Sequence, residues 1–231
     1  MFLRLNLELF FPLLIFGMYI SAVFLSLFFA KLLFIVVNII HKPREGIFLR
    51  DASDKDYRYW SIRNTIKKWP VWLAHKFPLP FLDNVCFKLF GVKTKFSNSL
   101  FEGWVDCEFI EFGKNVVVGQ ASIIQSAAII GNLFIIKKST FEDNVRIGAH
   151  SVIMSGVHIH KSSVLAASSL LVIGQELDEG WVYLGTPAKK YKKNVFFEDD
   201  LENILAKQDQ NIDEIHKKYE ELYKIRKDKK V

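Results

Sequence analysis

Apolar residues recur every six positions through the middle of the chain, with a single step of five between Ile136 and Phe141. The full set is Phe112, Val118, Ile124, Ile130, Ile136, Phe141, Ile147, Ile153, Ile159, Leu165 and Leu171. This regular spacing argues against antiparallel strands, which need turn signals about every eight to twelve residues. The period predicts a left-handed parallel β-helix from about residue 112 to 172, with six residues on each side of a triangular coil.

Small residues fit the corners of such a coil. A small or β-branched residue stands four places after most of the apolar positions, at Val116, Ser122, Ala128, Thr140, Val145, Ser151, Val157, Ser163 and Ser169. Glycine accepts backbone conformations that other residues resist, and it directly follows the apolar position at Gly113, Gly119, Gly131 and Gly148. Eleven sides, at three to a coil, give between three and four stacked coils.

A second apolar stretch lies near the start of the chain. No charged residue occurs from Leu9 to Ala30, and another apolar run follows from Leu32 to Ile40. At about 1.5 Å per helical residue, residues 9–30 cover roughly the 30 Å hydrocarbon thickness of a bilayer, which predicts a transmembrane helix. Two short spans broken near Ser21 and Ser26 are an alternative. A cleaved signal peptide is another, although its apolar region is normally about 7–15 residues long.

Charge gives the expected orientation and partners. Arg4 is the one basic residue before the apolar stretch, whereas the residues after it include Lys42, Arg44, Arg50, Arg58 and Arg63. The positive-inside rule therefore predicts a membrane protein whose large C-terminal part faces the cytoplasm. The net charge of +6 comes with no nucleic-acid motif, so membrane lipid is the expected partner and nucleic acid is not. Cys86 and Cys107 have neither CxxC nor zinc spacing, which fits a reducing compartment.

Helices are predicted on both sides of the repeat. Residues 46–76 mix aromatic and basic residues, which is typical of a helix at the lipid headgroups but also fits a helix capping the open end of the coil. Prolines at 70, 78 and 80 are expected to break any helix, and residues 81–90 predict a short one. From Asp199, apolar residues spaced four and three apart predict a helix that packs on the protein itself or on another copy.

The repeat resembles that of the hexapeptide-repeat acyltransferases. Ile147–Val157, Ala166–Leu170 and the closing Gly185-Thr186-Pro187-Ala188-Lys189 look like the C-terminal signature of that family. The resemblance implies a homotrimer that moves an acyl group from acyl-CoA, such as acetyl-CoA, to a hydroxyl or amine. The order of apolar span, Trp-rich basic stretch, Phe87–Lys93 segment and repeat is also similar to membrane-associated hexapeptide proteins related to the terminal region of certain peptide synthetases.

Acyl transfer needs a general base, and histidine is suited because its pKa lies near neutral pH. The resemblance places the catalytic histidine of the family just before the phase break, where this chain has Gln125. Glutamine cannot act as a base at neutral pH, although it can hold an acceptor by hydrogen bonds. His150, His158 and His160 fall at outward positions of the repeat, and His150 is the first candidate base. The alternative is that His150 only lines a subunit interface.

The resemblance also implies a donor site. Ala149, Ala166 and Ala167 would lie along the coil edge that binds the pantetheine arm, and Gly185, Lys189 and Lys190 would lie near the nucleotide phosphates. The alternative is that residues 185–190 only turn the chain out of the last coil. The γ-class carbonic anhydrases share the fold and bind a metal through three histidines. The spacings of eight and two from His150 to His160 do not match that pattern, so no metal site is expected.

These features together predict a membrane-anchored acyltransferase whose acceptor is a lipid-linked or envelope glycan. A non-catalytic trimeric scaffold at the membrane is the alternative. Gln125 in place of the histidine favours the scaffold, whereas Lys189 and Lys190 favour the enzyme. The expected organisation is a transmembrane anchor over residues 1–45, a helical juxtamembrane segment over 46–95, the β-helix over 96–193 and an amphipathic helix over 194–231.

Overall fold

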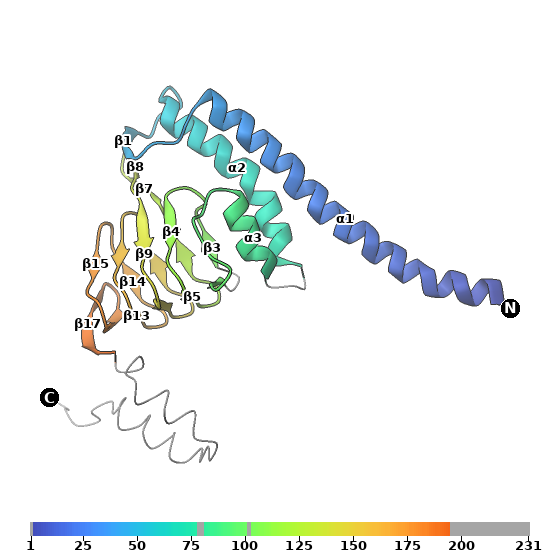
Figure 1. The fold of residues 1–231 in the computed structure, drawn as a ribbon. Coiled ribbons are helices and arrows are strands. Elements are labelled where there is room, and N and C mark those ends of the chain that lie inside the picture. Colours follow the sequence, from blue (N-terminus) through green and yellow to red (C-terminus); the bar gives the residue numbers. More distant parts are fainter. Residues whose placement is uncertain (1, 78–80, 101–102, 195–231) are drawn as a thin grey trace, which may run out of the picture. The chain divides into compact units, whose positions relative to one another are not determined.

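The computed structural model of this chain describes residues 2–77, 81–100 and 103–194 (Figure 1). The helix predicted over 194–231 lies outside the described residues, apart from Asn194. The described part begins with three helices and continues into a stack of short strands (Figure 1). The helices are α1 (Phe2–Ile40), α2 (Lys55–His75) and α3 (Phe81–Leu89), and the short strand β1 (Gly46–Leu49) lies between α1 and α2.

The short strands form three sheets, and the chain passes through each of them in turn in every coil. The first sheet holds β2 (Ser99–Leu100), β5 (Val117–Val118), β10 (Arg146–Ile147), β13 (Val164–Leu165), β16 (Trp181–Gly185) and β17 (Ala188–Lys193). The second holds β3 (Trp104–Val105), β6 (Ile123–Ile124), β11 (Val152–Ile153) and β14 (Leu170–Leu171). The third holds β4 (Ile110–Phe112), β9 (Ser139–Phe141), β12 (His158–Ile159) and β15 (Glu176–Leu177). Each circuit of the chain adds one parallel strand to each sheet, so the architecture is a parallel β-helix.

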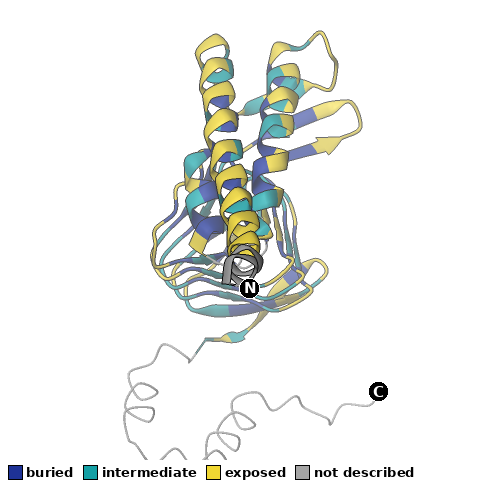
Figure 2. Ribbon diagram, turned by 90° about the vertical axis from the view of Figure 1, so that its right-hand side faces the viewer, coloured by how far each residue is buried: buried dark blue, intermediate teal, exposed yellow. Residues whose placement is uncertain are grey.

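The core of the β-helix consists of the apolar residues that the period of six predicts to point inward. Val118, Ile124, Ile153, Ile159, Leu165 and Leu171 are each 0% exposed. Figure 2 shows buried positions inside the coils and exposed ones along α1. Leu100, Val105 and Leu177 are buried in the same cluster, so the coil begins earlier and ends later than the predicted range of 112–172. The period of six does not extend to the first coil because its inward residues are spaced five and seven apart, although the β-helix domain predicted over 96–193 includes it.

The prediction that Ile130 and Ile136 continue the repeat is wrong. Residues 127–136 leave the coil as an antiparallel hairpin of β7 (Ala127–Ile130) and β8 (Leu133–Ile136), and β1 pairs with the outer edge of β8. Ile130 is 53% exposed, and Ile136 is buried in a separate cluster with Phe134. The turn residue Gly131 has φ +58°, a conformation that glycine accepts readily. The five-residue step therefore marks an excursion of the chain, after which the coil resumes at β9.

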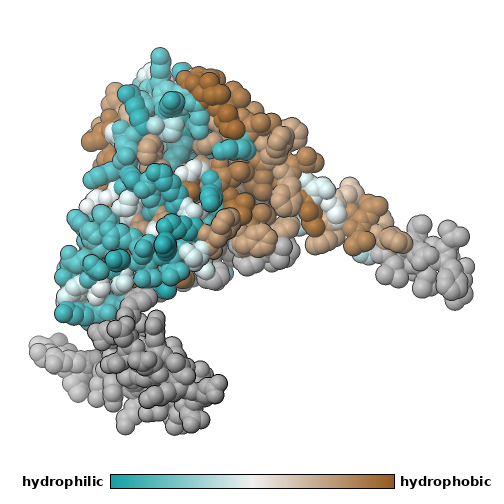
Figure 3. Space-filling model, viewed as in Figure 1, coloured by the Kyte–Doolittle hydropathy of each residue, from teal (hydrophilic) through white to brown (hydrophobic). Residues whose placement is uncertain are grey.

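Helix α1 is continuous through Ser21 and Ser26, so the alternative of two short spans does not match the structure. Residues 10–40 are long and apolar enough to cross a bilayer, and only 22% of the most apolar window is buried. The buried side chains form one stripe, Val23, Leu27, Ala30 and Phe34, in the same core cluster as residues of α2 and α3. Most other apolar side chains from Phe10 to Ile40 are exposed on the outside of the helix (Figure 3). Such an uncovered apolar surface is unlike that of a core helix in a soluble protein.

Helix α2 caps the first coil. Its side chains Arg63, Lys67, Val71 and Ala74 are buried, and Arg63 forms an ion pair with Glu108 of the coil. Asp54 caps the start of the helix by accepting hydrogen bonds from the N–H groups of residues 56 and 57. Pro70 does not break the helix, contrary to the expectation, since α2 continues to His75. The capping helix considered for residues 46–76 is confirmed for α2 alone, because residues 46–49 form β1 and pair with β8 instead. Helix α3 matches the helix predicted over 81–90.

We expect Ile153→Ala to lower the free energy of unfolding by about 2–5 kcal/mol, because it leaves a cavity in a fully buried column. Ile123→Ala is the matched control, since that side chain lies on a neighbouring strand and is 37% exposed. Urea unfolding of the full chain in mild detergent measures both values. Equal losses in the two variants would contradict the inward assignment of Ile153.

Candidate functional site

One edge of the β-helix, where the first and second sheets meet, carries His150. Ala121, His150 and Ser168 occupy this edge on successive coils, with φ of 55°, 58° and 55°. Backbone hydrogen bonds stack them: His150 N–H donates to Gln120 at 3.0 Å, and Ser168 N–H donates to the carbonyl of Ala149 at 2.9 Å. A positive φ is uncommon outside glycine, so the repeated turn fixes where these side chains lie. We call this column the histidine edge.

The predicted pantetheine-binding alanines lie on the histidine edge as well. Ala149 precedes His150, and Ala166 and Ala167 occupy the next coil. A Cβ added to Gly148 would lie 2.2 Å from the nitrogen of Ala167, so only glycine lets the two coils approach this closely. The edge is therefore lined by small side chains and backbone groups.

Buried serines fasten the coils together behind this edge. Ser122 Oγ donates to the carbonyl of Gly148 at 3.0 Å, and Ser151 Oγ donates to the carbonyl of Ala166 at 3.1 Å. Ser169 Oγ accepts a hydrogen bond from Gly185 N–H at 3.1 Å. Gly185 thus joins the column at its far end, and the structure brings five of the predicted residues to one edge: Ala149, His150, Ala166, Ala167 and Gly185.

The two predicted cations, Lys189 and Lys190, both lie on β17, but their side chains have different neighbours. Lys189 pairs in register with Leu184, next to Gly185, and its side chain is exposed. Lys190 donates to Asp178 at 2.6 Å, and its ammonium lies 4.0 Å from the centre of the Trp181 ring. The hydrogen bond from Lys190 lowers the pKa of the Asp178 carboxyl. Lys189 is therefore the cation available to the histidine edge, whereas the charge of Lys190 is paired elsewhere.

Gln125 lies away from the histidine edge. Its N–H donates to Ile153 at 2.9 Å, so it stands at the far end of β11 from His150, roughly 13 Å along an extended strand. Its carbonyl accepts a hydrogen bond from Ser139 Oγ at 3.2 Å, where the coil closes below the hairpin. Gln125 and His150 are thus not brought together. His150 itself is exposed and has no side-chain hydrogen bond among the described residues.

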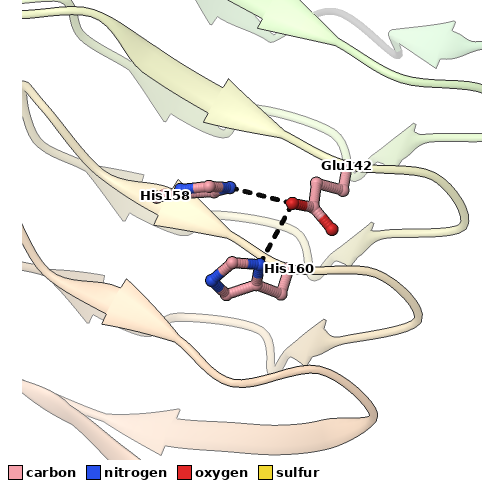
Figure 4. A group of neighbouring side chains, drawn as sticks. All are labelled: Glu142, His158 and His160. Atoms are coloured by element: carbon pink, nitrogen blue, oxygen red, sulfur yellow. Dashed lines mark hydrogen bonds and ion pairs between the residues drawn. The ribbon is translucent and has the colours of Figure 1, made fainter.

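The structure also assembles a cluster that the sequence did not predict. Glu142, His158 and His160 meet on the outward face of the third sheet (Figure 4). Glu142 Oε1 lies 3.1 Å from Nε2 of His158 and 3.0 Å from Nδ1 of His160. His158 lies on β12 and His160 directly follows that strand, two residues along the extended chain, so their side chains share a face. The two-residue spacing of the histidines was the sequence signal for a shared face. The carboxylate of Glu142 comes from the preceding coil, so the spacing of neighbouring residues could not predict it.

The cluster has a second layer of contacts. Glu142 Oε2 accepts a hydrogen bond from Lys161 N–H at 3.0 Å, and His160 Nε2 lies 2.7 Å from Glu176 Oε1. The hydrogen bond with Glu176, followed by that with Glu142, raises the pKa of His160 despite partial burial. Burial acts to raise the pKa of Glu142, but the Lys161 N–H and the two imidazoles outweigh it and the pKa is lowered. A pocket of about 520 Å³ opens beside Glu142 and His158.

Comparison with known proteins finds relatives over part of the chain. No family model matches the chain. Over 94 residues, 41% of this chain, it is 33% identical to the 2,3,4,5-tetrahydropyridine-2,6-dicarboxylate N-acetyltransferase of Staphylococcus aureus strain bovine RF122 / ET3-1. The protein of that name from strain JH9 matches to the same extent. The chain spans only 37% of the length of these curated relatives.

Two solved structures are similar at lower identity. A maltose O-acetyltransferase from Clostridium difficile 630 has a TM-score of 0.48 and 16% identity, covering 64% of this chain and 92% of the other. A galactoside acetyltransferase in complex with coenzyme A has a TM-score of 0.47 and 15% identity, covering 65% of this chain and 87% of the other. Likeness at this level carries no argument about the reaction.

We expect Ser169→Ala to cost about 1 kcal/mol of stability and to loosen the turn from Gly185 to Lys189, because the Gly185 N–H loses its partner. Hydrogen–deuterium exchange of the full chain in detergent should show faster exchange in that turn. Ser168→Ala is the control, since Ser168 is exposed and makes no side-chain hydrogen bond among the described residues. Unchanged exchange in Ser169→Ala would show that the serine does not position Gly185.

Proposed function

We propose, for a chain whose repeat region belongs to the hexapeptide-repeat acyltransferases, that the protein transfers an acyl group from acyl-CoA to a hydroxyl or amine. The observation that carries this proposal is the histidine edge. An exposed imidazole lies there beside a column of small residues, and a lysine lies near the end of the column. This arrangement offers a base, a surface for an extended donor arm and a cation for phosphate.

In the proposed reaction the acceptor oxygen or nitrogen attacks the thioester carbonyl of acyl-CoA. His150 takes the proton from the acceptor as the new bond forms. The carbon–sulfur bond then breaks, and the proton passes to the departing CoA thiolate. The small side chains of Ala149, Ala166 and Ala167 leave room along the edge for the pantetheine arm, while Lys189 attracts the nucleotide phosphates.

The name of the Staphylococcus aureus relative, an N-acetyltransferase, supports acetyl-CoA as the donor. The acceptor of that relative need not be the acceptor here, because the matched stretch covers little more than a third of it. We take the acceptor of this chain to be a lipid-linked or envelope glycan, since α1 would hold the enzyme at the membrane where such substrates reside. The coil is taken as left-handed and the assembly as a homotrimer, both by resemblance to the family.

The surface of α2 supports a membrane location, and the basic residues that follow α1 are the reason for placing the β-helix on the cytoplasmic side. Trp69 and Trp72 are 61% and 48% exposed and stack with ring centres 5.1 Å apart. With Lys68 and Trp104 they line a pocket of about 390 Å³. Exposed tryptophans beside lysine are favourable at the lipid headgroups. The helix therefore caps the coil with one face and offers aromatic side chains to the membrane interface with another.

Acetyl-CoA binding tests the donor site. We expect calorimetry on the full chain in mild detergent to detect binding, and Lys189→Ala to weaken it about fivefold, or ~1 kcal/mol, through loss of a phosphate contact. Lys95→Ala is the matched control, an exposed lysine of the first coil that should leave affinity unchanged. No binding at millimolar acetyl-CoA would overturn the enzyme proposal in favour of the trimeric scaffold.

A second experiment tests the base. His150→Ala should reduce turnover by about 100-fold or more, since general base catalysis contributes roughly 10²–10⁴-fold, while affinity for acetyl-CoA stays the same. Turnover is measured as release of CoA thiol in the presence of a lipid extract from the source cells. Gln125→Ala should leave the acetyl-CoA affinity unchanged, because Gln125 lies at the other end of β11. Undiminished turnover in His150→Ala would remove His150 as the base.

A further inference from the structure

We propose that Glu142, His158 and His160 bind a divalent transition-metal ion, such as Zn²⁺, on the outward face of the third sheet (Figure 4). This site is separate from the histidine edge and does not depend on the proposed acyl transfer. It also departs from the expectation of no metal, which considered only sets of three histidines. The ligand set here is two imidazoles and one carboxylate.

The register of the coils brings these ligands together. His158 pairs with Thr140 of the preceding coil, and Glu142 lies two residues beyond Thr140 on the same outward face. Glu142 N–H donates to the carbonyl of Ile159 at 2.9 Å, which places its side chain between those of His158 and His160. Coils stack at the spacing of neighbouring strands, about 4.8 Å. Both imidazoles can therefore reach the carboxylate of the coil before them.

The distances suit a small ion. One atom from each of the three side chains lies within 4.8 Å of the other two. A tetrahedral Zn²⁺ with bonds of about 2.0–2.1 Å needs ligand atoms roughly 3.3 Å apart, and the two distances to Glu142 are 3.1 and 3.0 Å. The two imidazole nitrogens lie within 4.8 Å of each other, so both can reach an ion placed beside Glu142.

The groups behind the ligands are those of a metal site. A metal-bound histidine usually gives its other ring N–H to a carboxylate or carbonyl, and His160 Nε2 lies 2.7 Å from Glu176 Oε1. The second oxygen of Glu142 accepts a hydrogen bond from Lys161 N–H at 3.0 Å. These contacts leave Nδ1 of His160 and Nε2 of His158 both directed toward Oε1 of Glu142 (Figure 4).

The chemistry of the set selects the class of ion. Imidazole nitrogen favours Zn²⁺, Co²⁺, Ni²⁺ or Cu²⁺ over Mg²⁺ and Ca²⁺, which prefer oxygen ligands. Three protein ligands leave a fourth position open for water on a face that adjoins the pocket of about 520 Å³. The ion would also link three successive coils, through Glu142, the two histidines and, indirectly, Glu176. Metal binding should therefore stabilise the folded chain.

The test uses the full chain in mild detergent after treatment with EDTA. Calorimetry with ZnCl₂ should show one site per chain, and CoCl₂ should give the visible absorption of a tetrahedral Co²⁺ centre with nitrogen and oxygen ligands. Zn²⁺ should also raise the melting temperature. None of these three readouts depends on acetyl-CoA, so failure of this site and failure of the proposed acyl transfer are distinguishable.

Variants identify the ligands. His160→Ala and Glu142→Gln should abolish the Co²⁺ absorption, whereas Glu176→Gln should weaken Zn²⁺ binding by about 10–100-fold, the usual effect of losing an outer-shell partner. Glu142→Gln keeps the size of the side chain, so it remains informative if His160→Ala does not fold. His150→Ala is the matched control and should bind Zn²⁺ as the unmodified chain does. Absence of any Zn²⁺ binding, or binding that persists in both ligand variants, would overturn the proposal.

Discussion

The hydrogen bonding of each coil to the next is the constraint on which the rest of the structure depends. A strand of two or three residues has too few backbone groups to be stable alone, and it persists here because the coils above and below satisfy those groups. Stacking in register requires each side to place its inward residue over the one before. Ile124 lies beside Ile153, and Ile153 beside Leu171, in one buried column. The period of six in the sequence is the consequence of this geometric requirement.

The same register creates both sites. A residue at a given place in the repeat stands about one strand spacing from its counterpart in the next coil. At the histidine edge this aligns Ala121, His150 and Ser168 and exposes backbone between them. On the third sheet it aligns the acidic side chain of Glu142 with the two histidines of the following coil, and these with Glu176. A β-helix thus builds sites from residues that are distant in sequence but equivalent in position.

The two ends of the stack are closed in different ways, because an open end would leave apolar side chains and strand edges uncovered. At the first coil, Leu82, Phe87 and Phe90 in and just after α3 join the core cluster that contains Leu100. Arg63 of α2 is 1% exposed and forms an ion pair with Glu108 of the coil. Separating the helices from the coil would leave each of these charges without its partner, so the ion pair opposes separation. At the last coil, β17 folds back antiparallel on β16 and ends the parallel ladder.

The sequence by itself determined the β-helix from Phe141 to Leu171, because there every side has six residues and the inward position repeats without interruption. The resemblance to the hexapeptide-repeat acyltransferases implied which small residues lie at the histidine edge. The period did not extend to the first coil, where the spacing of inward residues changes, although the predicted domain bounds of 96–193 include that coil. The sequence analysis also missed the hairpin of residues 127–136. The dipeptide Gly131-Asn132 between two apolar runs was the local hairpin signal. Only the tertiary structure decided that Gln125 and His150 lie apart and that Glu142 meets His158 and His160, because those relations depend on how one coil is placed on the next.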